Sequence, residues 1–178
     1  MSLQGTYSVP QIMIDLETLS PRYNAALLSI GACSFGEGKT YSEFYRVIDA
    51  KSCVAMGMHV DPDTMEWWKG QSSEAKAVFK ALSIPLKQAL LEFSEWMPGG
   101  GNKNMRLWAN GLAHDIPILT NAFETCGMKL PGHWANQLDA RTIYKLCPEV
   151  KWDRVTAAHN ALDDAKAQAL HLMKCLDI

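Results

Sequence analysis

Three segments near the start of the chain carry the hydrophobic pattern of β-strands. Residues 11–16, 26–35 and 39–48 form apolar runs or alternate apolar with polar positions, which is typical of strands. Gly36 and Gly38 separate the second segment from the third and supply a tight turn. The pattern predicts that the chain begins as an antiparallel meander.

Apolar residues adopt a helical spacing farther along the chain. Asp61 is a favourable N-cap, and Pro62 suits the first helical position after it. Between residues 86 and 97, apolar side chains recur at three- and four-residue steps. This spacing predicts an amphipathic helix.

A glycine-rich loop at 98–104 leads into the second half of the chain. The elements expected there are a short strand at 105–110, a helix at 115–126, a segment around 135–140, a helix ending near 146 and a final helix from about 161. A meander followed by alternating strands and helices predicts an α/β fold with a mixed sheet. Because neither side of the loop has enough strands to close a sheet, we expect one domain over residues 1–178, with a flexible N-terminus at 1–10.

The composition is that of an ordinary globular protein, with 178 residues, 48% of them hydrophobic and 20% charged. No apolar run approaches the roughly 20 residues that a membrane helix needs, so we expect no contact with membranes. Five cysteines lack metal-binding spacing and are odd in number, which argues against a disulfide framework and a zinc site and favours the cytoplasm. With a net charge of −2, any contact with nucleic acid must be local or carried by metal.

Two carboxylates interrupt the first apolar segment. Asp15 and Glu17 are two residues apart, so in a strand they point to the same face. They lie at the carboxyl end of that strand, where α/β sheets commonly bind ligands. A solvated strand end is the simpler interpretation of this pair taken alone.

Two further acidic positions lie near predicted helix starts. Asp115 follows the strand at 105–110, and N-capping alone would explain it. With Asn160 as the N-cap of the last helix, Asp163 falls where a carboxylate can contact the N-cap amide. Asp164 then has no capping role, and His159 lies just before the helix, free to project or simply exposed on the surface.

These motifs together resemble the DEDDh branch of the DnaQ-like 3′-5′ exonucleases, which have an RNase H-like fold. D-x-E in the first strand, N-x4-D after a middle strand and H-x4-D before the last helix occur in this order. The resemblance implies a mixed five-stranded sheet flanked by helices. It makes Asp15, Glu17, Asp115 and Asp164 metal-binding carboxylates and His159 the general base.

Finer features are similar to the DexA-like branch, which includes a mycobacterial exoribonuclease and exodeoxyribonuclease VIII-like proteins. They are the spacing from Asn110 to Asp115 and the segments "TMEWWKGQS" at 64–72 and "LDARTIY" at 138–144. Ala113 departs from the family pattern, because a large apolar residue is common just before the aspartate. Because of this departure, the family pattern does not fix the orientation of the Asp115 carboxylate in this chain.

The resemblance implies hydrolysis of single-stranded DNA or RNA ends to nucleoside monophosphates with two Mg²⁺ or Mn²⁺ ions. Such hard cations prefer oxygen ligands, and four carboxylates against two dications leave a nearly neutral site. An oligoribonuclease-like activity on short RNAs is one alternative. A catalytically silent module that binds nucleic acid or protein is another. Related enzymes are often homodimers, so a homodimer is expected.

The resemblance also suggests residues that contact the substrate. They are Leu16, Thr18, Leu19, Trp68, Gln71, Asn110 and Arg141. Trp67 and Trp68 belong either to the core or to a stacking platform for an unpaired base. Arg141 binds either a phosphate or a structural ion-pair partner. The backbone at 16–19 is expected to wedge against the terminal nucleotide.

Overall fold

A five-stranded mixed sheet forms the centre of the molecule. The computed structural model describes residues 9–98, 104–152 and 159–178. The strands are β1 (Gln11–Thr18), β2 (Leu27–Gly36), β3 (Lys39–Val47), β4 (Arg106–Ala109) and β5 (Gln137–Asp139), arranged in the order β3-β2-β1-β4-β5. Antiparallel pairing joins β1 to β2 and β2 to β3, whereas β4 is parallel to β1 and β5 to β4. This confirms the predicted meander and mixed α/β sheet.

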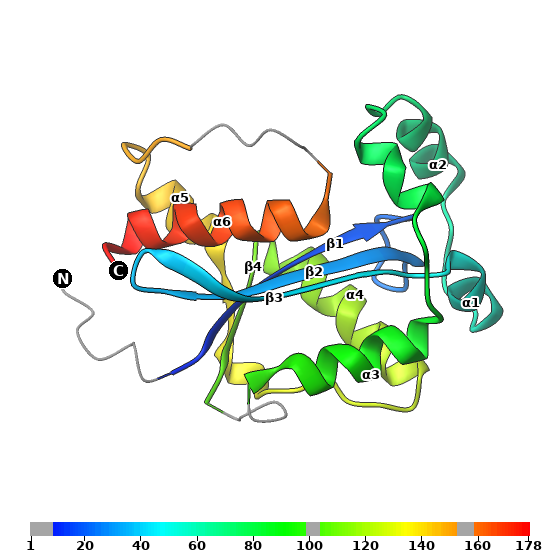
Figure 1. The fold of residues 1–178 in the computed structure, drawn as a ribbon, viewed down its shortest axis with the longest axis horizontal. Coiled ribbons are helices and arrows are strands. Elements are labelled where there is room, and N and C mark those ends of the chain that lie inside the picture. The colour runs from blue at the N-terminus through cyan, green and yellow to red at the C-terminus, as the bar shows by residue number, and fades with distance from the viewer. Residues whose placement is uncertain (1–8, 99–103, 153–158) are drawn as a thin grey trace.

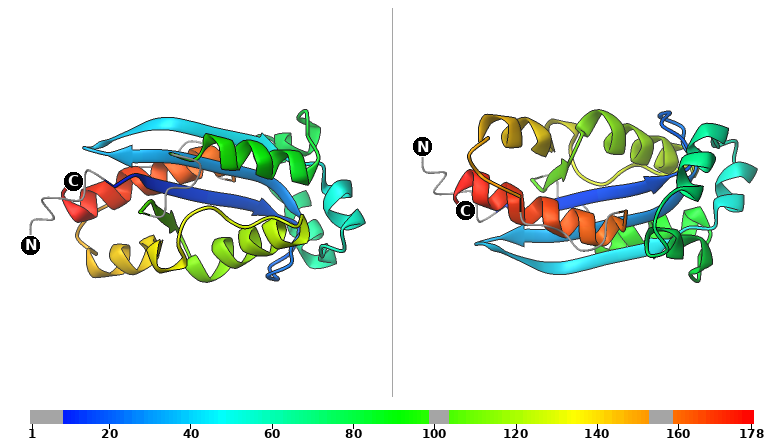
Figure 2. Two further views of the ribbon diagram at one scale, coloured as in Figure 1. Left: turned by 90° about the horizontal axis from the view of Figure 1, so that it is seen from below. Right: turned by 90° about the horizontal axis from the view of Figure 1, so that it is seen from above.

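Helices cover both faces of this sheet (Figures 1 and 2). They are α1 (Ala50–Ala55), α2 (Pro62–Lys69), the 3₁₀ helix η2 (Ala75–Lys80), α3 (Leu86–Trp96), α4 (Leu112–Thr125), the 3₁₀ helix η4 (Trp134–Asn136), α5 (Ala140–Leu146) and α6 (Ala161–Leu176). α6 crosses one face, α3 and α4 lie on the other, and α1 and α2 lie beyond the carboxyl end of β1. None of the helices in the described ranges is long and apolar enough to cross a membrane.

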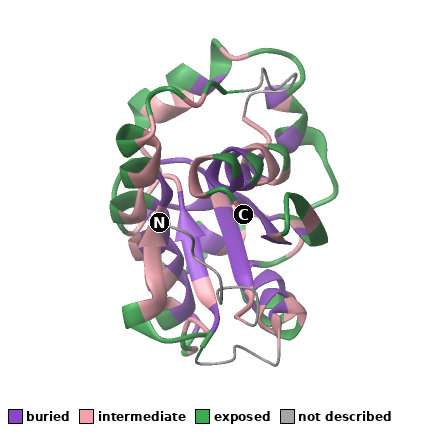
Figure 3. Cartoon of the chain, turned by 90° about the vertical axis from the view of Figure 1, so that its left-hand side faces the viewer, coloured by how far each residue is buried: buried purple, intermediate pink, exposed green. Residues whose placement is uncertain are grey.

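Alternate residues of β1 pack into different cores. Ile12, Ile14 and Leu16 belong to the large apolar core that includes α3 and α4. Met13 points the other way and belongs to a smaller core with residues of α6. The central strands are accordingly buried on both sides (Figure 3). Two predicted features, the N-terminus at 1–10 and the loop at 98–104, fall mostly outside the described residues.

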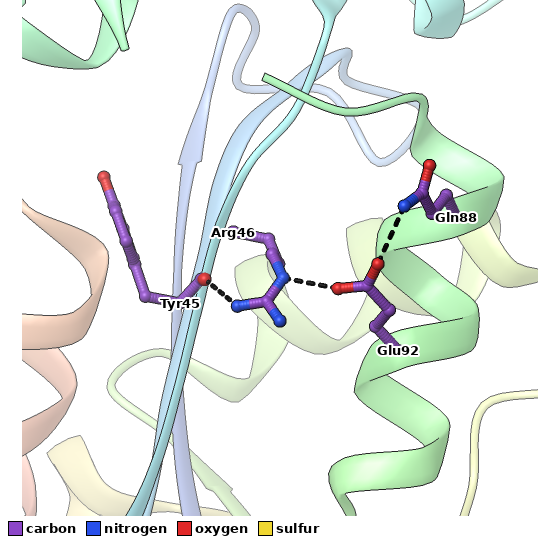
Figure 4. Close-up of polar contacts among 4 residues, drawn as sticks. All are labelled: Tyr45, Arg46, Gln88 and Glu92. Atoms are coloured by element: carbon purple, nitrogen blue, oxygen red, sulfur yellow. Dashed lines mark hydrogen bonds and ion pairs between the residues drawn. The ribbon is translucent and has the colours of Figure 1, made fainter. Parts of the chain in front are cut away.

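The edge strand β3 also contacts a different layer on each face (Figure 4). Arg46 pairs with Glu92 of α3, and Gln88 Nε2 donates a hydrogen bond of 2.9 Å to the same carboxylate. An exposed ion pair of this kind contributes only about 0–1 kcal/mol. Beneath it, the Phe44 and Phe93 rings pack edge to face at 5.1 Å. The neighbouring Tyr45 side chain points to the opposite side of the strand.

The start of α4 differs from the sequence prediction. The helix begins at Leu112, with Gly111 as its N-cap in a left-handed conformation (φ 112°). The Asp139 carboxylate of β5 accepts hydrogen bonds from the Gly111 and Leu112 amides at 3.2 and 3.0 Å. A capping partner distant in sequence thus starts the helix early. Asp115 lies inside the first turn, so the N-cap interpretation of this residue was wrong.

Candidate active site

The carboxyl end of β1 presents Asp15 and Glu17 toward α6. In the sheet register, Asp15 lies opposite Gly31 and Glu17 lies opposite Ser29. The two carboxylates share the face that carries Met13, as the strand periodicity predicts. Asp15, Glu17 and Asp164 each offer a carboxylate oxygen within 4.8 Å of the others. Residues from both ends of the chain therefore meet in one acidic cluster.

Gly31 allows α6 to reach this cluster. A Cβ atom at this position would lie 2.1 Å from the backbone carbonyl carbon of Ala161 and 2.2 Å from the Leu162 nitrogen. No side chain fits in such a space, so the first turn of α6 rests directly on the β2 backbone. Because Gly31 pairs with Asp15, this close packing places the start of α6 beside the acidic strand.

The N-terminus of α6 orients Asp164. Asn160 caps the helix, and its side-chain oxygen accepts hydrogen bonds from the Leu162 and Asp163 amides at 3.1 and 3.2 Å. Asp164 also reaches back, because its Oδ2 accepts a hydrogen bond of 3.0 Å from the His159 amide. The capping pattern in the sequence predicts a contact of this kind for Asp163. In the structure Asp163 is exposed, and Asp164 holds the turn before the helix.

Asp115 approaches the cluster from the other face of the sheet. Its carboxylate accepts a hydrogen bond from the Leu16 amide. The parallel pairing of β1 with β4 ends where Ile14 meets Ala109, so the Leu16 amide lies beyond the last pair. Asp115 is outside the group of three carboxylates within 4.8 Å, but its charge raises the pKa of both Asp15 and Glu17.

Burial and mutual repulsion raise the pKa values of these carboxylates. Burial has the largest effect on Asp15, followed by the charge of Asp115, and the Gln168 amide opposes both. Burial and the Asp164 charge raise the pKa of Glu17 to about 8. Burial raises the pKa of Asp115 to about 7, against the effect of the Leu16 amide. This all-oxygen cluster concentrates negative charge, and a hard divalent cation fits it.

Gln168 belongs to the site and was missed from the sequence. Its Nε2 donates a hydrogen bond of 2.8 Å to Asp15 Oδ1. Gln168 is buried in α6, and its Oε1 has no hydrogen-bond partner among the described residues. The available signal was its position, one turn after Asp164 and beside Ala165 and Ala169 on the buried stripe. A buried amide on such a stripe indicates a polar partner on the sheet.

His159 adopts an unusual backbone conformation next to the cluster. Its φ angle is +67°, a left-handed value that is uncommon for residues other than glycine. Its ring packs edge to face against Trp67, with ring centroids 5.0 Å apart. The imidazole also lowers the pKa of Asp164. His159 thus lies between α2 and the acidic cluster.

The two tryptophans of α2 have opposite environments. Trp68 is 2% exposed, and its indole Nε1 donates a hydrogen bond of 2.9 Å to the Thr18 carbonyl. The prediction that Trp68 stacks on substrate was therefore wrong, because almost none of its surface is exposed. Trp67 is 47% exposed. Trp68 instead anchors α2 to the end of β1.

The segment expected to wedge against substrate has buried leucine side chains and internal hydrogen bonds. Leu16 and Leu19 are 6% and 4% exposed and lie in the large apolar core. The Leu19 amide donates to the Ala26 carbonyl at 2.9 Å, and Thr18 Oγ1 donates to the Ser20 carbonyl at 3.0 Å. The two leucine side chains are thus part of the core, and the wedge, which was predicted for the backbone at 16–19, stays a prediction.

Three remaining predicted contacts lie near the site with internal partners. Gln71 Nε2 donates a hydrogen bond of 3.1 Å to the Trp67 carbonyl. Arg141 is exposed, and its Nη2 donates to the Asn110 carbonyl at 3.1 Å. The guanidinium charge lowers the pKa of Asp115. Arg141 forms no salt bridge with the residues that the structure describes, so its role as a phosphate contact stays a prediction.

A family model described as the 3′-5′ exoribonuclease Rv2179c-like domain matches residues 10–176. The chain belongs to this family. Membership confirms the resemblance to the 3′-5′ exonucleases. No curated protein sequence matches the chain.

Solved nuclease structures confirm the RNase H-like fold. Escherichia coli exonuclease I with a dA16 oligonucleotide has a TM-score of 0.66 and 12% identity, covering 95% of this chain and 42% of that one. Exonuclease X with 5′-overhanging duplex DNA has a TM-score of 0.59 and 14% identity, covering 94% and 91%. The nuclease domain of 3′hExo, a DEDDh family member bound to rAMP, has a TM-score of 0.65 and 13% identity, covering 94% and 92%. This chain thus spans less than half of exonuclease I.

Proposed function

We propose that this protein is a metal-dependent 3′-5′ exonuclease that removes nucleoside monophosphates from single-stranded ends with two Mg²⁺ or Mn²⁺ ions. The observation that carries the proposal is the meeting of Asp15, Glu17 and Asp164 within 4.8 Å, with Asp115 close enough to raise the pKa of two of them. An acidic site of this kind suits divalent cations and phosphodiester hydrolysis. The whole chain would act as one exonuclease domain.

The four carboxylates would hold the ions. When bound, divalent cations favour ionisation of water and neutralise charge that develops on phosphoryl oxygens. The donor set supports Mg²⁺ or Mn²⁺, because it contains oxygen ligands and no cysteine. Gln168 fixes the orientation of Asp15 through the 2.8 Å hydrogen bond to Oδ1. The His159 amide does the same for Asp164.

His159 would act as the general base that takes a proton from the attacking water. A histidine suits this task because its ordinary pKa lies near neutrality. The ring already lies close enough to the cluster to affect the pKa of Asp164. Arg141 would contact a phosphate of the strand, since its guanidinium is exposed near Asp115.

The similar proteins support a sugar preference. The family is described as an exoribonuclease family, which favours RNA. Exonuclease I and exonuclease X are described with DNA, but at 14% identity or less they share only the fold. We therefore propose RNA ends as the preferred substrate, with single-stranded DNA as the second.

The test is a paired assay of the wild type and Asp15→Asn on matched RNA and DNA strands. One set of strands is blocked at the 3′ end and the other at the 5′ end. Monophosphates should appear only from strands with an open 3′ end, only with Mg²⁺ or Mn²⁺, and not with the variant. Hydrolysis that survives Asp15→Asn, or that needs an open 5′ end, would overturn the proposal.

The cellular location and the oligomeric state of the protein are argued from features outside the site. All five cysteines are free, which suits a reducing compartment, so a cytoplasmic location remains our prediction. The homodimer also remains a prediction. Light scattering of the purified protein, across a dilution series, would show its mass in solution.

A further inference from the structure

A small groove lies beside α2, outside the acidic cluster. It has a volume of about 260 Å³ and is lined by Met65, Trp68, Lys69, Lys76, Phe79 and Lys80. Pockets for whole drug-sized ligands usually measure ~300–1,000 Å³, so this groove suits one planar ring. Its walls are apolar and aromatic, and the charged residues that line it are all lysines.

A continuous line of aromatic rings connects the groove to the candidate active site. The ring centroids are 5.0 Å apart between His159 and Trp67, and 5.1 Å apart between Trp67 and Trp68. Trp68 in turn meets Phe79 at 5.4 Å, again edge to face. Phe79 is 43% exposed. An open aromatic surface therefore lies two ring contacts beyond the tryptophan that touches the proposed general base.

The lysines give the groove a charge opposite to that of the acidic cluster. Lys80, the last residue of η2, is exposed. Lys76 Nζ donates a hydrogen bond of 3.0 Å to the Lys69 carbonyl, and the Lys69 ammonium pairs with Glu66 at 2.7 Å. The protein as a whole carries a net charge of −2. A local cationic rim around an aromatic floor fits a ligand with a planar base and anionic phosphates.

We propose that this groove binds one nucleotide of the substrate strand on the 5′ side of the scissile bond. Its base would lie against Phe79 and its phosphates near Lys76 and Lys80. The inference rests on the proposed function, because a 3′-terminal nucleotide in the acidic cluster leaves only the 5′ part of the strand to extend elsewhere. Stacking and lysine contacts would make this binding tolerant of sequence and sensitive to salt.

The experiment measures binding of a fluorescent single strand of about 12 nucleotides, a length within the site sizes of ~4–16 known for single-strand binders. Fluorescence anisotropy would be recorded with Asp15→Asn protein, which prevents turnover, and with Phe79→Leu or Lys80→Gln added. Competition by a nucleoside monophosphate gives the affinity of the acidic site alone. Lys129→Gln serves as the matched control, since this exposed lysine follows the far end of α4 from Asp115.

Loss of the Phe79 ring should reduce the ratio of strand affinity to monophosphate affinity about tenfold. Lys80→Gln should lower the slope of log affinity against log salt by about 0.7, the value for one phosphate contact on a single strand. Lys129→Gln should change neither quantity. Equal strand binding by all variants would overturn the proposal, as would strand and monophosphate affinities that fall in the same proportion.

The outcomes separate this inference from the proposed function. If the wild type hydrolyses strands and the groove variants bind them normally, the exonuclease assignment holds and the groove proposal is rejected. If the wild type hydrolyses nothing but binds the strand through Phe79 and Lys80, the enzymatic assignment is rejected and the groove proposal holds.

Discussion

The two faces of β1 bury side chains of different kinds. One face carries Ile12, Ile14 and Leu16 into an apolar core shared with α3 and α4. The other carries Met13 into a smaller core under α6 and then presents Asp15 and Glu17. Adjacent residues of one strand therefore have opposite effects: burying an apolar side chain stabilises the fold, whereas gathering carboxylates opposes it.

The apolar face of β1 therefore contributes to the stability of the fold, and the acidic face contributes to the proposed chemistry. The pKa values of Asp15, Glu17 and Asp115 are all raised, with burial as the main cause. Raised pKa values mean that ionisation of these groups destabilises the metal-free protein. The apolar face must therefore supply the stability that the acidic face lacks, and substitutions on the two faces should have distinct signatures.

The largest effect is expected from Asp15→Asn. The variant should lose activity by on the order of 10³-fold, because a bound cation contributes several kcal/mol to the transition state. The metal-free protein should be at least as stable as the wild type near neutral pH, since the amide does not ionise and does not repel the neighbouring carboxylates. Initial rates with Mn²⁺ and denaturant unfolding in EDTA measure the two effects. A variant that loses stability and activity together would contradict the comparison.

The neighbouring substitution Ile14→Ala should show the reverse. Ile14 is fully buried, and truncation of such a side chain destabilises by about 2–5 kcal/mol. Urea unfolding should show this loss, while the rate per folded molecule stays unchanged at low temperature. A fall in that rate, with stability retained, would mean that the apolar face also shapes the site.

Gly31→Ala should affect both properties through the position of α6. The added Cβ would lie 2.1 Å from the Ala161 backbone, so the first turn of α6 must move away from β1. We expect a loss of about 1–3 kcal/mol in stability, as for overpacking, with reduced activity and metal affinity. Gly70→Ala is the control, because a Cβ there meets its nearest neighbour, the Trp67 carbonyl oxygen, at 3.4 Å. Normal metal binding by Gly31→Ala would show that the contact is not needed.

The last prediction is a pH dependence of the metal-free protein. The pKa of Glu17 rises from 4.5 to about 8 on folding, so the native state retains a proton that the unfolded state releases. Stability from this group is fully present below 4.5 and is lost as the pH rises toward 8. The melting temperature in EDTA should therefore fall over this range, by about 2–4 °C for each kcal/mol lost.

Two controls sharpen the pH experiment. Glu17→Gln should flatten the decline, because its side chain does not ionise. Mg²⁺ or Mn²⁺ should raise the melting temperature most at high pH, where the carboxylates are free of protons. A melting temperature in EDTA that rises between about pH 6 and 8 would refute the assignment of a buried, uncompensated carboxylate.

Local sequence signals predicted most of the elements correctly. The three opening strands, the Asp61 and Asn160 caps and the amphipathic helix α3 agree with the structure. Each of these depends on neighbouring residues, through side-chain periodicity or a capping hydrogen bond. The predicted start of α4 was wrong because its capping carboxylate, Asp139, comes from strand β5, which is distant in sequence.

The candidate site was predictable only in part. The acidic residues were identified because their order along the chain resembles a known family, and the structure brings Asp15, Glu17 and Asp164 together. Gln168 was missed because an amide within a helix carries no motif. Trp68 was misassigned because Trp67 and Trp68 are equivalent in sequence, and only the packing of α2 decides which ring is buried.

The sequence by itself determined which residues of β1 share a face, where α6 begins and which side chains have the chemistry to hold a cation. These properties follow from backbone periodicity, local hydrogen bonds and functional groups. Only the tertiary structure decided that the first turn of α6 rests on Gly31, that Asp115 accepts a hydrogen bond from Leu16, and that an aromatic line leads from His159 to the groove. Such contacts join residues distant in the chain, and packing of the whole fold is what brings them together.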